Sequence, residues 1–254
     1  DADNATTITM SREDEAVFTE YLPIAAAFEI VSSPSVLIVE PGGGLDILAA
    51  LHHGARRIVA LSSQPIVADL LRDQFRSEVE DGTLDVVEGN PRSYLKQSDE
   101  QFDLVIISLA DTFRPVQAGA FSLSENHVYT RDAFSAYFDH LSPGGVLAAT
   151  RWVQVPPSEE MRMAATVIEV LDGRAGVAVE RVIVALRTLQ TLTVFARTGD
   201  FEAQELNAFR DFARTRQMDL SYVPGIRSEE LNQYFVLPDE VYFRGITELL
   251  DESR

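Results

Sequence analysis

Residues 36–51 read VLIVEPGGGLDILAAL, and this stretch decides the fold. Its first four residues form a short continuous apolar run, which is typical of a strand buried on both faces of a parallel sheet. The consecutive glycines Gly42, Gly43 and Gly44 follow, and residues 45–51 then carry apolar side chains at helical spacing. A strand, a glycine turn and a helix in this order place free backbone N–H groups and the positive end of a helix at one point.

The glycine turn predicts a nucleotide- or nucleoside-binding crevice at the carboxyl end of the first strand, because glycine lets a ligand approach the backbone closely. The spacing is not GxGxxG, since Ile47 stands at the third glycine position, and a tight connection without a ligand is the alternative. Glu40 is a candidate contact for a cofactor's amino group or sugar, and its charge favours a cationic nucleoside over a dinucleotide. Asp46 is a second candidate contact, although carboxylates are favourable in the first turn of any helix.

Composition and charge exclude several classes of protein. The net charge of −19 over 254 residues argues against nucleic-acid binding, which needs basic patches. It is compatible with a cationic substrate such as a polyamine, with a solubilising acidic surface as the alternative. No apolar run reaches the ~18–20 residues of a membrane helix, so we expect no membrane span in this chain. The absence of cysteine excludes disulfides and thiolate sites, and no histidine spacing predicts a metal.

Strand-like and helix-like segments alternate along the chain. After the first strand, buried strands are expected at 57–61, 83–88, 102–108 and 145–151, which predicts a doubly wound parallel sheet. The runs 180–186 and 191–197 are too close together for a crossover helix, so they must pair antiparallel. We therefore predict an α/β fold with a mostly parallel seven-stranded sheet and an antiparallel closing hairpin.

Helices are expected at 11–22, 45–51, 64–75, 130–141, 158–171, 201–216 and 239–251. Two of them are expected to pack through apolar faces, made of Val17, Phe18, Tyr21 and Leu22 in one and of Ile66, Val67, Leu70, Leu71 and Phe75 in the other. We divide the chain into a lead-in (1–35), a nucleoside-binding domain (36–200) and a helical extension packed on it (201–254). The long loop 109–127 is expected to be functional. The chain opens at Asp1, which indicates an excerpt or a processed product.

One block has a specific resemblance. SLSENHVYTRDAFSAYFDHLSPGGVLAATRW (122–152), together with 36–51, resembles the spermidine synthase-like proteins, and ITMSREDEAVFTEYLP (8–23) is similar to the end of their N-terminal hairpin. The resemblance implies the class I S-adenosylmethionine-dependent methyltransferase fold and a cytoplasmic site, in some relatives as part of a membrane-anchored polypeptide. The implied cofactor is S-adenosylmethionine or its decarboxylated form, and true members transfer an aminopropyl group to putrescine. The sequence leaves a homodimer open.

The resemblance also assigns residues, and several depart from the family pattern. Ser62 and Ser63 stand where a carboxylate would hold the ribose, and Asn90 replaces the acid near the adenine. Of the two aspartates expected after the fourth strand, the first, which takes the proton from the amine, is Ser108. The second remains as Asp111, a candidate amine anchor or base that could instead cap a turn. Two further positions are Thr9 in place of a cofactor-binding glutamine, and Tyr129, which resembles a substrate-side residue.

These departures leave two hypotheses. Replacing two charged hydrogen-bond acceptors by neutral ones weakens cofactor binding by ~2–3 kcal/mol without abolishing the site. Losing the general base is more serious, because such a group contributes ~10²–10⁴-fold to the rate. The chain is therefore either a transferase that uses S-adenosylmethionine, its decarboxylated form or a related nucleoside such as methylthioadenosine, or a ligand-binding or interaction domain that has lost the reaction.

Overall fold

A computed structural model describes residues 13–110, 127–237 and 239–252. Its centre is an eight-stranded sheet in the order β3-β2-β1-β4-β5-β7-β6-β8. The first five strands in this order pair parallel and the last three antiparallel, which confirms the predicted α/β architecture. The strands are β1 (Ser35–Val39), β2 (Arg57–Ser62), β3 (Leu84–Glu88), β4 (Phe102–Ser108), β5 (Leu141–Trp152), β6 (Ile183–Arg187), β7 (Thr191–Ala196) and β8 (Asp219–Tyr222).

The sheet has eight strands where the sequence predicted seven, and the additional strand is β8. β8 pairs antiparallel with β6 and places Asp219 opposite Arg187. These two side chains form a buried ion pair at 2.6 Å. Polar residues in this four-residue segment hide the apolar alternation of a strand, and no strand was predicted there from the sequence.

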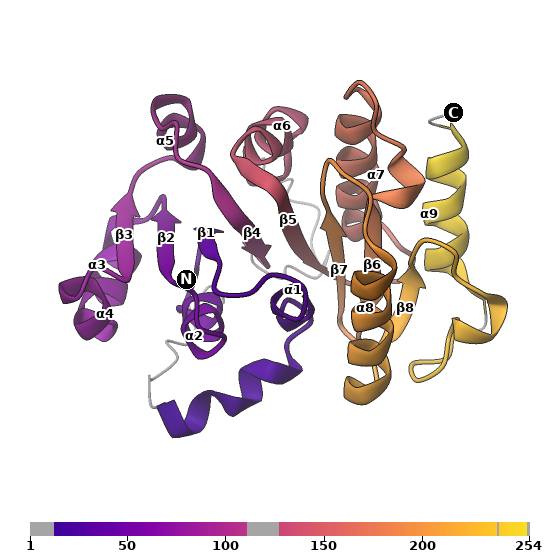
Figure 1. The fold of residues 1–254 in the computed structure, drawn as a ribbon, viewed down its shortest axis with the longest axis horizontal. Helices are drawn as coiled ribbons and strands as arrows, with labels where there is room; N and C mark the ends of the chain where they lie inside the picture. The colour runs from indigo at the N-terminus through magenta and orange to yellow at the C-terminus, as the bar shows by residue number, and fades with distance from the viewer. Residues whose placement is uncertain (1–12, 111–126, 238, 253–254) are drawn as a thin grey trace, which may run out of the picture.

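Helices cover both faces of the sheet (Figure 1). Alternate residues of β1 point to opposite faces, so Val36 and Ile38 lie in one hydrophobic cluster and Leu37 and Val39 in the other. The first cluster includes residues of α1, α2, α3 and α8, and the second includes residues of α5, α6, α7 and α9. The helices are η2 (Glu13–Tyr21), α1 (Ala25–Phe28), α2 (Leu45–His52), α3 (Pro65–Gln74), α4 (Arg76–Glu80), α5 (Pro91–Gln97), η3 (His127–Tyr129), α6 (Arg131–Asp139), α7 (Glu159–Asp172), η4 (Val179–Arg181), α8 (Ala203–Arg216), η5 (Ser228–Glu230) and α9 (Val241–Glu252).

The prediction that Val17, Phe18 and Tyr21 form a buried apolar helix face is wrong. Val17, Phe18 and Tyr21 are exposed, whereas Ala16 and Thr19 are buried. The segment η2 is a 3₁₀ helix, in which residues three apart share a face, so the α-helical spacing assumed from the sequence does not apply.

The prediction of the apolar face of α3 is also partly wrong. Leu71 and Phe75 are buried, but Ile66 is 75% exposed and Leu70 is also exposed. The buried face of α3 is therefore narrower than the sequence pattern suggested.

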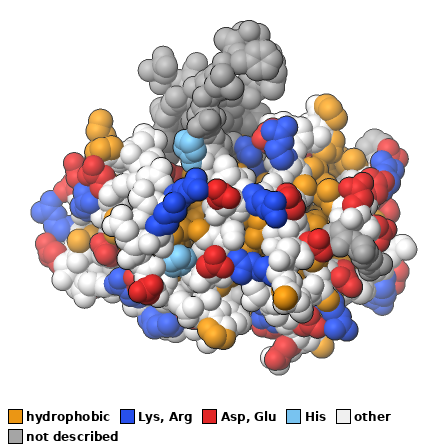
Figure 2. Space-filling model, turned by 90° about the horizontal axis from the view of Figure 1, so that it is seen from above, with side chains coloured by type: hydrophobic (Ala, Val, Ile, Leu, Met, Phe, Trp, Pro, Cys, Tyr) orange, Lys and Arg blue, Asp and Glu red, His pale blue; other side chains and the backbone are white. Residues whose placement is uncertain are grey.

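Polar contacts of Glu20 connect the N-terminal segment η2 with α8 and α2. Arg216, the last residue of α8, donates to the backbone oxygen of Glu20 at 2.9 Å and to its carboxylate at 3.1 Å. The same carboxylate lies 3.3 Å from Nε2 of His52 in α2. Figure 2 shows acidic and basic side chains interspersed over the face seen from above. Of the helices within the described ranges, none combines the length and apolarity that crossing a bilayer requires.

Candidate functional site

The sheet order places a topological switch point between β1 and β4. From β1 the chain adds β2 and then β3 on one side, and it crosses to the other side to form β4. Crevices that bind ligands in doubly wound sheets open at the carboxyl ends of the strands where the order reverses. Three candidate residues from the sequence lie at these ends: Glu40 directly after β1, Ser62 at the end of β2 and Ser108 at the end of β4.

Glu40 is fixed across the ends of two strands. Its backbone N–H donates to the Leu61 carbonyl at 2.8 Å, and its φ of 54° lies in the left-handed region. Both carboxylate oxygens accept from the backbone N–H of Ser63, at 3.2 and 3.3 Å. Glu40 is only half-buried, so this anchor leaves acceptor capacity on an oriented carboxylate at the carboxyl ends of β1 and β2.

The three glycines of the turn have different roles. A Cβ on Gly44 would lie 2.7 Å from Cε2 of Phe75 and 3.0 Å from Cδ2 of Leu71, and the residue has a φ of 85°. Gly44 is therefore required for the packing of α3 against the start of α2. Gly42 also has a positive φ, of 52°, and both Gly42 and Gly43 are half-exposed. The part of the turn open to a ligand is Gly42 and Gly43.

Asp46 and Ser108 bring two polar groups together at the switch point of the sheet. Asp46 lies in the first turn of α2 and is 5% exposed. Burial raises the pKa of its carboxyl from 3.8 to about 7, and the neighbouring Ser108 hydroxyl lowers this pKa in part. The Ser108 Oγ is itself buried, and no described residue forms a hydrogen bond of good geometry with it. A buried carboxyl and a buried hydroxyl thus lie next to each other at the switch point, and the hydroxyl offsets only part of the effect of burial on the carboxyl pKa.

The neutral replacements at Ser62 and Asn90 are engaged locally. The Ser62 hydroxyl donates to the Gln64 carbonyl at 3.2 Å and lies 3.3 Å from the Gln64 N–H, which closes the turn after β2. Asn90 is exposed, and its Oδ1 accepts from the Arg92 N–H at 2.9 Å as the N-cap of α5. These oxygens stabilise a turn and a helix start.

Tyr129 connects the ends of two strands. Its hydroxyl accepts from the Ala110 N–H at 3.2 Å and donates to the Thr150 carbonyl at 3.2 Å. The guanidinium of Arg151 lies 4.5 Å from the centre of the Tyr129 ring. Sequence reasoning missed Arg151, a mostly buried cation, and the only signal was an arginine at the end of an apolar strand. Asp111 and Thr9 lie outside the described residues.

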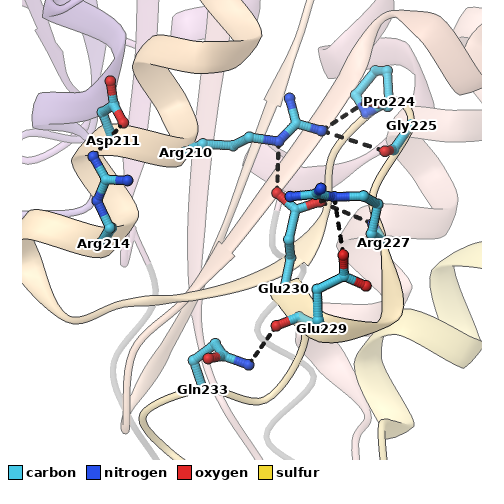
Figure 3. Close-up of polar contacts among 9 residues, drawn as sticks. All are labelled: Arg210, Asp211, Arg214, Pro224, Gly225, Arg227, Glu229, Glu230 and Gln233. Atoms are coloured by element: carbon cyan, nitrogen blue, oxygen red, sulfur yellow. Dashed lines mark hydrogen bonds and ion pairs between the residues drawn. The ribbon is translucent and has the colours of Figure 1, made fainter.

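A second polar hollow lies between α8 and the segment after β8 (Figure 3). It has a volume of about 480 Å³. Arg210 pairs with Glu230 at 2.7 Å, Arg214 pairs with Asp211 at 2.7 Å, and Arg227 lies against Glu230 at 3.3 Å. These charges compensate one another, so the hollow has few unpaired charges with which to bind a charged ligand.

Comparison with known proteins supports the fold. No protein-family model and no curated protein sequence matches the chain. A spermidine synthase in complex with the transition-state analogue AdoDATO matches with a TM-score of 0.55 and 18% identity, over 96% of this chain and 78% of that one. Spermidine synthase from Thermotoga maritima gives a TM-score of 0.54 and 18% identity, over 96% and 77%.

A putative methyltransferase that depends on S-adenosylmethionine, from Streptococcus mutans, also matches. Its TM-score is 0.51 at 12% identity, over 69% of this chain and 47% of that one. At such low identities the likeness concerns the fold. The chain has the α/β fold that spermidine synthases share with class I S-adenosylmethionine-dependent methyltransferases.

Proposed function

We propose that the crevice at the carboxyl ends of β1, β2 and β4 binds an adenosine-type nucleoside with a sulfonium or thioether side arm. The ligand would be S-adenosylmethionine, its decarboxylated form or methylthioadenosine. The observation that carries this proposal is the Glu40 carboxylate, which the Ser63 N–H anchors at 3.2 Å beside the half-exposed Gly42 and Gly43. An oriented carboxylate suits the hydroxyl or amino donors of a nucleoside and disfavours phosphate.

Transfer of an aminopropyl or methyl group to an amine is the catalytic form of this proposal. Its supports are the fold, the nucleoside-type site and the acidic net charge of −19, which favours a cationic acceptor such as putrescine. Asp111 would anchor the acceptor amine, and Tyr129 would line the acceptor side.

A binding or interaction domain without transferase activity is the second candidate. The observation that favours it is Ser108, because a serine hydroxyl at the end of β4 does not accept a proton near neutral pH. The local bonds of Ser62 and Asn90 point in the same direction, since these oxygens already have partners.

Calorimetric titration with the three nucleosides tests the binding proposal. We expect Glu40→Gln to weaken nucleoside binding about tenfold, because a charged acceptor becomes neutral. Glu80→Gln makes the same change at an exposed site at the end of α4 and should leave binding unchanged. Absence of binding by the unmodified chain at millimolar nucleoside contradicts the proposal. Turnover with putrescine and decarboxylated S-adenosylmethionine then separates transferase from binder.

A further inference from the structure

Three buried carboxyl groups differ in what surrounds them. Glu160 is 0% exposed and accepts from the N–H groups of Gln154 and Ser158 and from the hydroxyl of Tyr242. Asp219 is 1% exposed and has a cation at 2.6 Å and two backbone donors. A buried carboxylate needs such partners, because transfer out of water is costly. Asp46 is the exception.

Only two influences act on the Asp46 pKa within the described residues: burial and the Ser108 hydroxyl. Of the elements near α2, β4 provides Ser108, whereas no charged group of η2, β1 or β2 shifts this pKa. Glu20 of η2 lies beside His52 and Arg216, and Arg57 of β2 pairs with Glu100. When Asp46 is ionised, its buried negative charge therefore has no counter-charge among the described residues.

The place of Asp46 gives this imbalance a functional meaning. The residue lies at the first turn after the glycine bend, beside the last residue of β4, at the switch point of the sheet. The Oγ of Ser108 beside it is buried and has no well-formed hydrogen bond within the described part of the chain. Among the described residues, a buried carboxyl without a counter-charge thus lies beside a buried hydroxyl without a well-formed hydrogen bond, which indicates a place where a ligand completes the set.

We infer that Asp46 is a ligand-coupled proton site, whose carboxyl is partly protonated in the free chain at neutral pH and becomes fully ionised when the cationic arm of a nucleoside enters beside it. The inference rests on the proposed function, because it needs a nucleoside in this crevice. The step is an acid dissociation: the O–H bond of the carboxyl breaks, the proton passes to solvent and the carboxylate keeps the electron pair. No bond of the ligand changes.

Proton release during binding is the signature of this site. At pH 7 a carboxyl of pKa about 7 is half-protonated, so binding of a cation should release about half a proton per site. Calorimetric titration with decarboxylated S-adenosylmethionine, in two pH 7 buffers of different ionisation enthalpy, measures this number. Methylthioadenosine has a neutral arm and should release no proton.

Three variants make the assignment specific. Asp46→Asn should still bind methylthioadenosine but release no proton with the cationic nucleoside. Ser108→Ala keeps the carboxyl and removes the group that lowers its pKa, so release at pH 7 should increase. Asp99→Asn, an exposed change just before β4 at the opposite edge of the sheet, should match the unmodified chain.

The outcomes separate this inference from the proposed function. Binding of the cationic nucleoside without proton release, or equal release by Asp46→Asn, overturns the role of Asp46 and leaves nucleoside binding intact. Absence of binding by every nucleoside removes both. Release that disappears only in Asp46→Asn and increases in Ser108→Ala supports the inference.

Discussion

Replacing Asp46 by asparagine should stabilise the chain at alkaline pH more than at acidic pH. The folded-state pKa of this carboxyl is raised to about 7, above the 3.8 of an ordinary aspartate. The unfolded chain therefore releases this proton at a lower pH than the folded chain does. Stability falls as the pH rises from about 4 to about 7 and is constant above that range. The asparagine variant lacks this dependence.

The size of the effect follows from the pKa. Between pH 5 and pH 7 each pH unit costs the unmodified chain about 1.4 kcal/mol, so the advantage of Asp46→Asn should grow by ~3 kcal/mol between pH 5 and pH 8. For a chain of this length that corresponds to roughly 6–12 °C in Tm. Thermal unfolding followed by circular dichroism gives the Tm of both chains at pH 5 and at pH 8. The quantity to compare is the difference in Tm between Asp46→Asn and the unmodified chain at each pH.

Comparing the two chains at each pH cancels the titration of every other group, including the histidines. Asp99→Asn provides the control, since its exposed carboxyl should give no growing advantage. An equal effect of Asp46→Asn at pH 5 and pH 8 would refute the reasoning, because the Asp46 carboxyl would then have an ordinary pKa in the folded chain.

Two further predictions concern packing and the buried ion pair. Gly44→Ala places a Cβ 2.7 Å from an aromatic carbon at positive φ, and should cost about 2–4 kcal/mol. A Cβ on Gly82 would have no atom within 4 Å, although the φ is 82°, so Gly82→Ala should cost about 1–2 kcal/mol. Urea titration of both glycine variants measures these losses of stability. Arg187→Ala leaves Asp219 buried and should cost about 3–5 kcal/mol, with Tm as the measurement. Arg181→Ala removes an exposed pair and should cost less than about 1 kcal/mol; similar losses for both arginines would contradict this difference.

Local sequence patterns were enough for the parallel part of the fold. The run 102–108 is apolar and short, and β4 occupies the same residues. A helix was expected to begin at residue 130, and in the structure Thr130 caps α6, because its Oγ1 accepts from the Ala133 N–H at 3.2 Å. Such features depend on neighbours in the chain, so composition and periodicity reveal them.

Features that depend on distant residues were not predictable in this way. β8 needs the pairing of Asp219 with Arg187, 32 residues away. The Glu40 anchor needs β2 beside β1, in the register that places Val39 opposite Leu61. The sequence predicted Glu40 and Ser63 as separate contacts, and only the paired strands show that one orients the other.

The free energy needed to ionise the buried Asp46 carboxyl affects both the stability of the fold and the choice of ligand. In the free chain its ionisation is opposed by burial, with no counter-charge among the described residues. A cation in the crevice would supply that counter-charge, so the free energy that ionisation costs the fold reappears as selectivity for a positively charged ligand. Glu160 and Asp219 show that this fold can compensate a buried carboxyl fully where the role is structural. The incomplete compensation at the switch point is therefore better explained by binding than by packing.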